Sequence, residues 1–410
     1  MEEDLVTHPT GTTKIAHRTA RSLVAAFMLS ASSAVAWAEP VTIGFATAQS
    51  GFMVGFDGDA HNMAQLWIED RNAAGGLLGE QVQSVMADTK SDRVEGARAG
   101  QTVVNDGADI VLVSCDYDYG SPAAGAAQRA NLISVFLCAE DPKAGVQGVG
   151  AYSFTTSVAS HVQGAVLGHW AHENLQMRRP YVLLDTATEY NKSVCAGFRW
   201  AVSQLDDVVI AGEDTFKNED PSIQSQITRL RTMNEAPDAI MLCSYIPGGA
   251  SALRQIRAAG IDLPILGGGA MDGSYWLEGT PGLKDFYVTV AASVHGDDPR
   301  PEILALNERY TARYGNTPFT TYAYPIYAFL DLWARAVEEA GTTDAAAVVP
   351  ILEAMKGEQT FIGPRSFSPE LHIQQNAEML ILRYGDGKAQ VQGAYTLSEP
   401  VPMEVLFGRN

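Results

Sequence analysis

Strand-like and helix-like segments alternate regularly along most of this chain, and this alternation limits the folds that it can adopt. Apolar, β-rich runs occur at residues 41–46, 82–87, 109–113 and 132–137, and segments with helical spacing separate them at 60–72, 93–105 and 121–130. Alternation of this kind predicts a parallel sheet that is covered by helices on both faces.

The pattern restarts after residue 160. Helices are expected at 160–175, 191–205, 222–233 and 250–259, and strands at 181–185, 208–211, 239–243 and 265–266. Two series predict an α/β chain with two doubly wound parallel-sheet lobes and a ligand site beyond the carboxyl ends of the strands. The last part has helical spacing at 300–314, 321–340 and 345–355, and it ends in a predicted hairpin of 379–384 and 389–392.

Residues 1–38 have the pattern of a secretory signal. Lys14, Arg18 and Arg21 form a basic start, residues 23–36 are apolar and small, and Ala36-Trp37-Ala38 is an A-x-A cleavage site. The apolar run is too short and too rich in Ala and Ser for a membrane anchor, which needs about 20 apolar residues. We therefore expect cleavage after Ala38 and export to the periplasm.

Charge and motifs exclude several classes of protein. The formal net charge of −20 disfavours nucleic acid and anionic membranes as partners and favours neutral or cationic ligands. G-x-S-x-G, H-E-x-x-H and C-x-x-C motifs are absent from the sequence, and Gly267-Gly268-Gly269 reads as a strand-to-loop turn. His169 and His172 have metal-ligand spacing, but such histidines more often lie in a core or on a surface. We expect no enzyme, no cofactor and no metal.

The four cysteines predict two disulfides, because an exported chain meets an oxidising compartment. Cys115 and Cys138 each follow an apolar strand, so neighbouring parallel strands would bring them together, and Cys195 and Cys243 remain as a second pair. Two alternatives stay open: free buried thiols, or a soft-metal site made by Cys115, Asp116, Cys138 and Glu140.

Several motifs resemble a known family. Residues 72–79 (Asn-Ala-Ala-Gly-Gly-Leu-Leu-Gly) and 87–92 (Ala-Asp-Thr-Lys-Ser-Asp) are similar to the N-A-A-G-G-I-x-G and D-x-x-S-D patterns of the leucine/isoleucine/valine-binding protein family. Further similar segments are 153–156, 163–164, 237–240, 266–268 and 363–364. The family consists of type I periplasmic binding proteins that serve ABC importers, and the resemblance covers residues 41 to about 395.

The resemblance implies a three-strand hinge between the lobes. Crossings are expected near residues 155–157, 291–294 and 361–363. Lobe 1 would then contain residues 39–156 and 293–361, and lobe 2 would contain residues 157–292 and 362–410.

The resemblance also implies a set of ligand contacts. The predicted contacts are Phe56, Asp116, Tyr117, Cys138, Ala139, Glu140, Tyr190, Tyr245, Asp272 and Phe319. Asp116 is included because it is an acid next to Tyr117. The family's carboxylate-binding Ser and Thr fall on Tyr117 and Glu140, and its amine-binding Glu falls on Gly269, three residues before Asp272. Glu140 would repel a ligand carboxylate, so a cation, an amide, a polyol or an aromatic compound is expected. If the loop alignment is shifted by one or two residues, an ordinary amino-acid site is the alternative.

The expected function is capture of a small polar organic solute and its delivery to an inner-membrane ABC permease. The resemblance implies hinge closure of the two lobes around the solute, and we expect a monomer. A ligand-presenting sensory protein is the alternative. A transcription regulator of the same fold is disfavoured by the signal segment, and an enzyme by the missing catalytic motifs.

Overall fold

The computed structural model describes residues 40–408, so the predicted signal segment lies outside the described residues. A first sheet has five strands in the order β2-β1-β3-β4-β5, and every pairing in it is parallel. Its strands are β1 (Val41–Thr47), β2 (Val82–Asp88), β3 (Ile110–Val113), β4 (Ile133–Phe136) and β5 (Ser153–Phe154). Four of them match the predicted strands of the first series.

A second sheet has seven strands in the order β12-β11-β10-β9-β8-β6-β7. The strands are β6 (Pro180–Asp185), β7 (Gly212–Phe216), β8 (Ala239–Cys243), β9 (Ile265–Gly267), β10 (Phe286–Val290), β11 (Met379–Gly385) and β12 (Lys388–Tyr395). The strands from β6 to β10 are parallel, while the C-terminal hairpin of β11 and β12 is antiparallel. The prediction of two α/β sheet units is confirmed.

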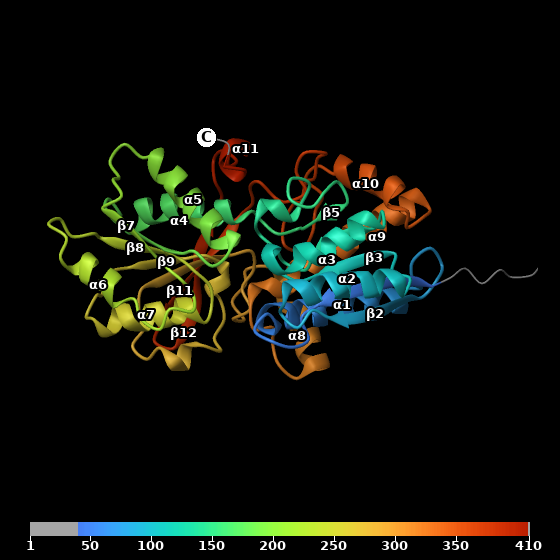
Figure 1. Ribbon diagram of the computed structural model, residues 1–410, viewed down its shortest axis with the longest axis horizontal. Coiled ribbons are helices and arrows are strands. Elements are labelled where there is room, and N and C mark those ends of the chain that lie inside the picture. Colours follow the sequence, from blue (N-terminus) through green and yellow to red (C-terminus); the bar gives the residue numbers. More distant parts are fainter. Residues whose placement is uncertain (1–39, 409–410) are drawn as a thin grey trace, which may run out of the picture. The chain divides into compact units, whose positions relative to one another are not determined.

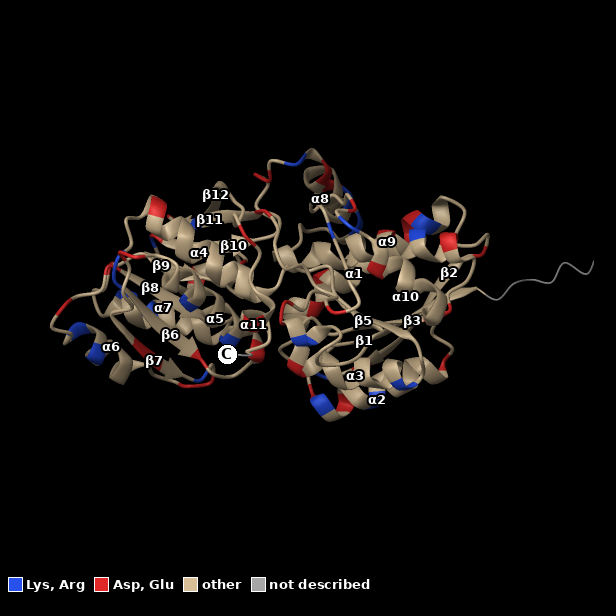
Figure 2. Cartoon of the chain, turned by 90° about the horizontal axis from the view of Figure 1, so that it is seen from above, with Lys and Arg blue, Asp and Glu red and all other residues tan. Residues whose placement is uncertain are grey.

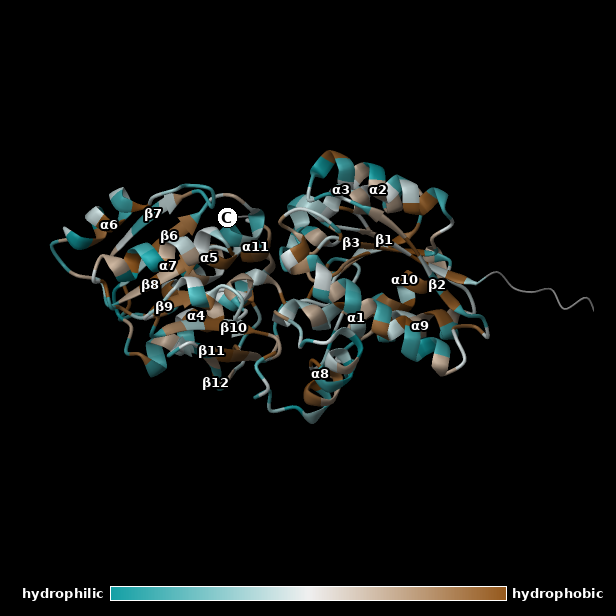
Figure 3. Ribbon diagram, turned by 90° about the horizontal axis from the view of Figure 1, so that it is seen from below, coloured by the Kyte–Doolittle hydropathy of each residue, from teal (hydrophilic) through white to brown (hydrophobic). Residues whose placement is uncertain are grey.

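Helices cover both sheets, and the strands form the core. The longer helices are α1 (Val54–Ala73), α2 (Arg93–Asn105), α3 (Tyr117–Arg129), α4 (Ser160–Asn174), α5 (Glu189–Ser203), α6 (Gln224–Arg231), α7 (Gly248–Ala258), α8 (Pro301–Tyr314), α9 (Tyr324–Ala340) and α10 (Ala345–Ala354). Every residue of β1, β3, β4 and β8 is buried, as expected for strands with helices on both faces. Figure 3 shows these hydrophobic strands between helices whose outer faces are hydrophilic. Within residues 40–408, each helix is too short or too polar to span a bilayer.

The C-terminal segments return to both units. Helices α8 and α9 pack against α1, where the Tyr310 hydroxyl donates to Asp59 (2.6 Å) and the Trp67 indole donates to Asp331 (2.7 Å). The chain then continues into β11 and β12 of the second sheet. In Figure 1 the orange helices α9 and α10 accordingly lie beside the blue and cyan elements, and the red hairpin lies beside the yellow strands.

Several predicted boundaries need correction. The strand predicted at 208–211 is wrong, because β7 begins at Gly212 and carries the polar sequence Gly-Glu-Asp-Thr-Phe at the sheet edge. The strand β10 was not predicted, although its sequence Phe-Tyr-Val-Thr-Val is buried throughout. Helix α1 begins at Val54 rather than at residue 60. The segment predicted as one helix from residue 321 divides into the 3₁₀ helix η4 (Thr321–Ala323) and α9.

Both predicted disulfides are present. Strands β3 and β4 are parallel neighbours with Val113 opposite Phe136, so Cys115 and Cys138 lie two residues beyond a matched pair. Their Cα atoms are 4.5 Å apart, and those of Cys195 and Cys243 are 5.8 Å apart. The alternatives of free thiols and of a cysteine-ligated metal are therefore wrong, because no described cysteine is free.

Candidate ligand-binding site

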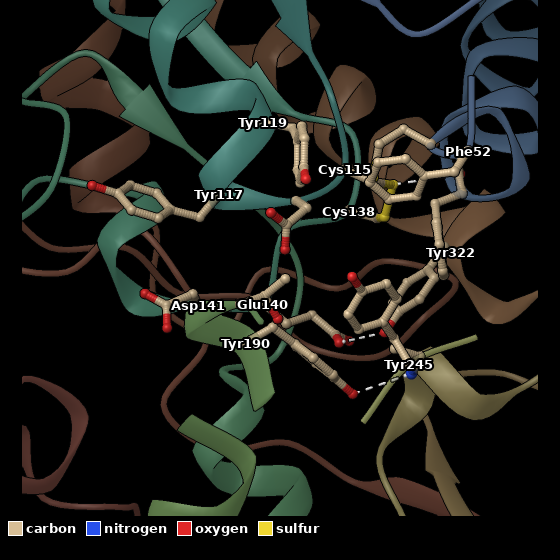
Figure 4. Close-up of a pocket in the computed structure, with 15 residues that line it drawn as sticks. Phe52, Cys115, Tyr117, Tyr119, Cys138, Glu140, Asp141, Tyr190, Tyr245 and Tyr322 are labelled. Carbon is tan, nitrogen blue, oxygen red and sulfur yellow. Dashed lines mark hydrogen bonds between the residues drawn. A yellow bond between two sulfur atoms is a disulfide. The ribbon is translucent and has the colours of Figure 1, made fainter. Parts of the chain in front are cut away.

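A cavity of about 480 Å³, part of it open to solvent, lies beyond the carboxyl ends of strands from both sheets. This is the position that the doubly wound pattern predicts. The residues that line it are Phe52, Met53, Phe56, Cys115, Asp116, Tyr117, Tyr119, Cys138, Glu140, Asp141, Thr188, Tyr190, Tyr245, Ala270 and Tyr322 (Figure 4). They come from the start of α1, the segments after β3 and β4, the start of α5, the segments after β8 and β9, and η4.

Most of the predicted contacts line this cavity. Phe56, Asp116, Tyr117, Cys138, Glu140, Tyr190 and Tyr245 all belong to its wall. Asp116 and Glu140 therefore line the cavity, and a shift of the loop alignment to the family would not remove these acids from it. The Gly-Gly-Gly turn ends β9 and begins the 3₁₀ helix η2 (Gly269–Met271), which brings Ala270 to the wall.

Asp272, which was predicted as a ligand contact, does not line this cavity, and its carboxylate contacts other groups. It accepts hydrogen bonds from the Tyr384 hydroxyl (2.6 Å) and the Thr321 backbone N–H (2.8 Å), and it lies 3.0 Å from His295 Nε2. Burial opposes a charge on His295, but the bond to Asp272 raises the pKa of His295 above its ordinary value. Asp272 thus belongs to a buried network outside the cavity.

Phe319 and Ala139 also lie outside the cavity. The Phe319 side chain is 49% exposed, and its ring lies near Tyr275 beside a separate hollow at the start of α1. Its backbone N–H donates to Asp59, which fixes this segment against α1. Ala139 is buried between two wall residues, and its carbonyl accepts a hydrogen bond from the Thr155 hydroxyl (2.9 Å).

The cavity wall includes residues that the sequence did not single out as ligand contacts, namely Phe52, Met53, Cys115, Tyr119, Asp141, Thr188, Ala270 and Tyr322. Tyr119 and Asp141 follow predicted strand ends, so their place in the chain could have indicated them. Tyr322 gives no such signal, because it lies 182 residues from Glu140, whose carboxylate it contacts.

Glu140 is a buried acid of the wall, with 7% of its surface exposed. The Tyr322 hydroxyl donates a 2.8 Å hydrogen bond to Glu140 Oε2. Burial raises the pKa of Glu140 to about 8, even though the Tyr322 hydrogen bond favours the charged form. A charged partner in the cavity would therefore change the protonation of this group.

Asp116 and Asp141 complete the acidic part of the wall. Asp116 caps α3 by accepting from the Asp118 backbone N–H (2.8 Å), and burial, together with repulsion from Asp118 and Asp141, raises its pKa to about 8. Asp141 accepts from the Ser193 hydroxyl (2.5 Å) and the Lys143 backbone N–H (2.9 Å). Burial also raises the pKa of Asp141. We call Asp116, Glu140 and Asp141 the acidic wall.

Aromatic rings form most of the remaining surface. The Tyr190 hydroxyl donates to Gln163 Oε1 (2.9 Å) and accepts from the Ala270 backbone N–H (3.1 Å), which fixes its ring. The Phe56 ring centroid lies 6.4 Å from that of Tyr245 and 6.1 Å from that of Tyr322. Figure 4 shows that Tyr117 points away from these rings, and it stacks instead on Phe136.

Among the described residues that line the cavity there is no Lys or Arg. The nearby Lys143 forms an ion pair with Glu189 at the start of α5. Figure 2 shows that basic residues lie on outer helices such as α2 and α6. The cavity therefore offers carboxyl groups and aromatic faces, and its side chains supply no positive charge for an anion.

Comparison with known proteins gives one family. A family model described as periplasmic binding protein matches residues 40–389. The Leu/Ile/Val-binding protein homolog 3 of Brucella melitensis is 24% identical over 351 residues, which cover 85% of this chain and 92% of that protein. This relative aligns over nearly its whole length, so the likeness includes both sheets.

Two solved structures share the fold. One is the branched-chain amino acid transporter substrate binding protein of Streptococcus pneumoniae in complex with isoleucine, with a TM-score of 0.75, 23% identity, and coverage of 88% of this chain and 99% of that chain. The other is a solute binding protein of an ABC transporter from Rhodopseudomonas palustris in complex with 3,4-dihydroxy benzoic acid. Its TM-score is 0.72 at 17% identity, with coverage of 88% of this chain and 98% of that chain.

Proposed function

This chain belongs to the periplasmic binding protein family, and on that premise we propose that it captures a small polar organic solute for an ABC importer of the branched-chain amino acid type. The observation that carries the proposal is the cavity between the strand ends of the two sheets, which is lined from both units. Its relatives include Leu/Ile/Val-binding proteins, and the family consists of solute-binding proteins. We infer that this chain also binds its solute without transforming it.

The proposed mechanism is closure of two lobes around the solute. Helix α5, which belongs with the second sheet, directly contacts the segment that follows β4 of the first sheet. The Ser193 hydroxyl donates a 2.5 Å hydrogen bond to Asp141 Oδ2, and Glu189 forms an ion pair with Lys143. The Glu189 backbone N–H also donates to Asp118 on α3 (3.0 Å). Contacts of this kind stabilise a closed form, and a bound solute adds to them only when both walls reach it.

The lobe boundaries follow as part of the same proposal, with lobe 1 at 39–156 and 293–361 and lobe 2 at 157–292 and 362–410. Four features support it. Strand β5 ends at Phe154 in the first sheet, β10 ends at Val290 in the second sheet, and α8 packs on α1. Near the third crossing, Arg365 Nε donates a hydrogen bond to the Thr156 carbonyl (2.8 Å), and the Gln374 backbone N–H donates one to the Ser157 carbonyl (3.1 Å). The first and the third crossing segments therefore lie side by side.

Export to the periplasm and action as a monomer belong to the proposal too. Both disulfides agree with an oxidising compartment. Protein isolated from the periplasm of its source should begin at Glu39, and its mass in solution should be that of one chain. An N-terminus at Met1 would contradict export with cleavage after Ala38.

The experiment that tests the function is small-angle scattering of the purified mature protein during a solute screen. A solute that binds should reduce the radius of gyration, because two lobes approach each other. Deletion of the gene should then abolish uptake of that solute by cells. Uptake that continues after deletion, with loss of a response to the solute, would favour the alternative of a sensory binding protein. If no solute of any charge class binds or reduces the radius of gyration, the proposed function is wrong.

A further inference from the structure

We propose that the solute is a small organic cation, an amine or amidine without a carboxylate, whose charged nitrogen is held by the acidic wall. This inference rests on the proposed function, because it names the ligand class of the same cavity. It departs from the two solved structures named above, whose bound ligands are isoleucine and 3,4-dihydroxy benzoic acid, both of which carry a carboxyl group.

The first argument is the charge of the cavity. Three carboxyl groups line it, and no Lys or Arg does within the described residues. Asp116 and Glu140 take part in no ion pair of the described residues, and the groups that hydrogen-bond to them are uncharged. These are the Asp118 and Tyr119 backbone N–H groups for Asp116, and the Tyr322 and Gln163 side chains for Glu140. A buried carboxylate without a counter-charge is costly, and a bound cation supplies the missing charge. A bound anion would add repulsion to the same cost.

The second argument is the position of Glu140. Its side chain is buried and lines the cavity. An ionised glutamate only accepts hydrogen bonds, so it cannot donate to a ligand carboxylate. An ammonium or amidinium group supplies the donors that it requires.

The third argument is the aromatic surface. Three rings form a group around Phe56. The Phe56 ring centroid lies 6.4 Å from that of Tyr245 and 6.1 Å from that of Tyr322. Ring faces attract organic cations, and they also cover the apolar part of such a ligand. Rings and carboxyl groups together favour a cation that has a short hydrocarbon body over an inorganic ion.

Binding of a cation is expected to release protons from the acidic wall. The titratable groups around Glu140 are Tyr322 and Tyr190, and those around Asp116 and Asp141 are Asp118, Tyr117, Tyr119, Tyr245, Lys143 and Glu189. Lys143 is the basic member of this set, and Glu189 pairs with it. Because the cation favours the ionised carboxyl groups, its affinity should rise from pH 6 to pH 9.

The test uses matched sets of solutes and titration calorimetry at pH 7.5. Each set has one hydrocarbon body with an ammonium, an amidinium, a hydroxyl or a carboxylate group, for example 3-methylbutylamine, 3-methylbutanamidine, 3-methylbutanol and 3-methylbutanoate. We expect a cation of at least one set to bind tenfold or more tightly than its carboxylate and hydroxyl partners. If a carboxylate or an uncharged solute binds while its cation does not, the inference is wrong and the proposed function stands. If no solute of any charge class binds, both fail.

Two variants locate the effect. Glu140→Gln and Asp116→Asn keep the side-chain size, and asparagine can still cap α3. Each should weaken binding of the best cation about tenfold to a hundredfold, because a charge-assisted hydrogen bond is lost. Glu308→Gln, which removes an exposed acid on α8, should leave the affinity unchanged. Equal affinity in all three variants would overturn the assignment of the acidic wall.

Discussion

The Tyr322 hydroxyl donates a 2.8 Å hydrogen bond to Glu140 Oε2, although the two residues lie 182 positions apart in the sequence. Tyr322 belongs to η4, which packs against α1, and Glu140 follows the strand β4. Both residues line the cavity. The bond therefore links a C-terminal segment to the acidic wall and holds a buried carboxyl group of the site in place.

Tyr322→Phe should destabilise the empty protein, because it removes a hydroxyl that donates to a buried carboxyl group. The expected loss in the free energy of unfolding is about 1 kcal/mol at pH 6 and about 2–3 kcal/mol at pH 9, where Glu140 is ionised. Urea denaturation at the two pH values measures it. Tyr395→Phe is the matched control, since its hydroxyl donates to the exposed Glu173, and it should cost less than about 0.5 kcal/mol.

Glu140 should also make the stability of the empty protein depend on pH. Its folded-state pKa is about 8 against an ordinary value of 4.5, so the folded chain binds more protons than the unfolded chain between these values. The stability is therefore fully present below about pH 4.5 and decreases as the pH rises to about 8. Asp116, whose pKa is also raised to about 8, acts in the same direction.

Glu140→Gln isolates this effect. Between pH 5 and pH 8.5 the wild-type protein should lose about 1–3 kcal/mol more of its unfolding free energy than the variant does. Urea denaturation series at both pH values give the difference. Parallel pH profiles for the two proteins would contradict a raised pKa at this position.

The two disulfides should differ in their effect on binding. They join residues separated by 23 and 48 positions, so removal of either should cost about 3–4 kcal/mol of stability in the chain-entropy description. Cys115 and Cys138 line the cavity, whereas Cys195 and Cys243 do not. The double Cys→Ala variant of the first pair should lower both the melting temperature and the solute affinity. The same change in the second pair should lower only the melting temperature, and an equal loss of affinity would refute the distinction.

The sequence predicted the fold well where patterns are local. Apolar strands such as β1 and β8 are buried on both faces, and helical spacing gave the position of α8 to within one residue. The failure at β7 has a physical reason, because an edge strand faces water and can be polar. Strand β10 was not predicted, although its apolar sequence carries the ordinary signal of a buried strand.

The site was less predictable, because its geometry depends on contacts between distant segments. Residues near the ends of β3 and β4, such as Asp116 and Glu140, could be predicted from strand order together with the resemblance. The buried network around Asp272 could not be predicted, because its partners Tyr384 and Thr321 come from other parts of the chain. Tyr322 was missed for the same reason.

Ser193→Ala tests whether the contact between α5 and the acidic wall belongs to the closed form. The Ser193 hydroxyl donates to Asp141 Oδ2 (2.5 Å), so its loss should weaken solute binding about threefold to tenfold by making closure less favourable. Calorimetry with the best cation of the solute screen measures this. Ser203→Ala on the same helix is the control, because its hydroxyl donates to the Trp200 carbonyl away from the cavity.

Leucine itself should bind poorly, because the acidic wall interacts differently with its amine and with its carboxylate. The acidic wall can hold the amine of leucine, but it repels the carboxylate, and no Lys or Arg lines the cavity within the described residues to offset that repulsion. Leucinamide has the same side chain and amine with a neutral amide in place of the carboxylate, so it should bind at least tenfold more tightly than leucine. In Glu140→Thr, which installs the hydroxyl that the resemblance implies, the preference should shift toward leucine, because a repelling acceptor becomes a donor. Calorimetric titration of both compounds into both proteins decides the matter. Micromolar or tighter binding of leucine to the wild-type protein, with no gain for leucinamide, would show that the acidic wall does not select against a carboxylate.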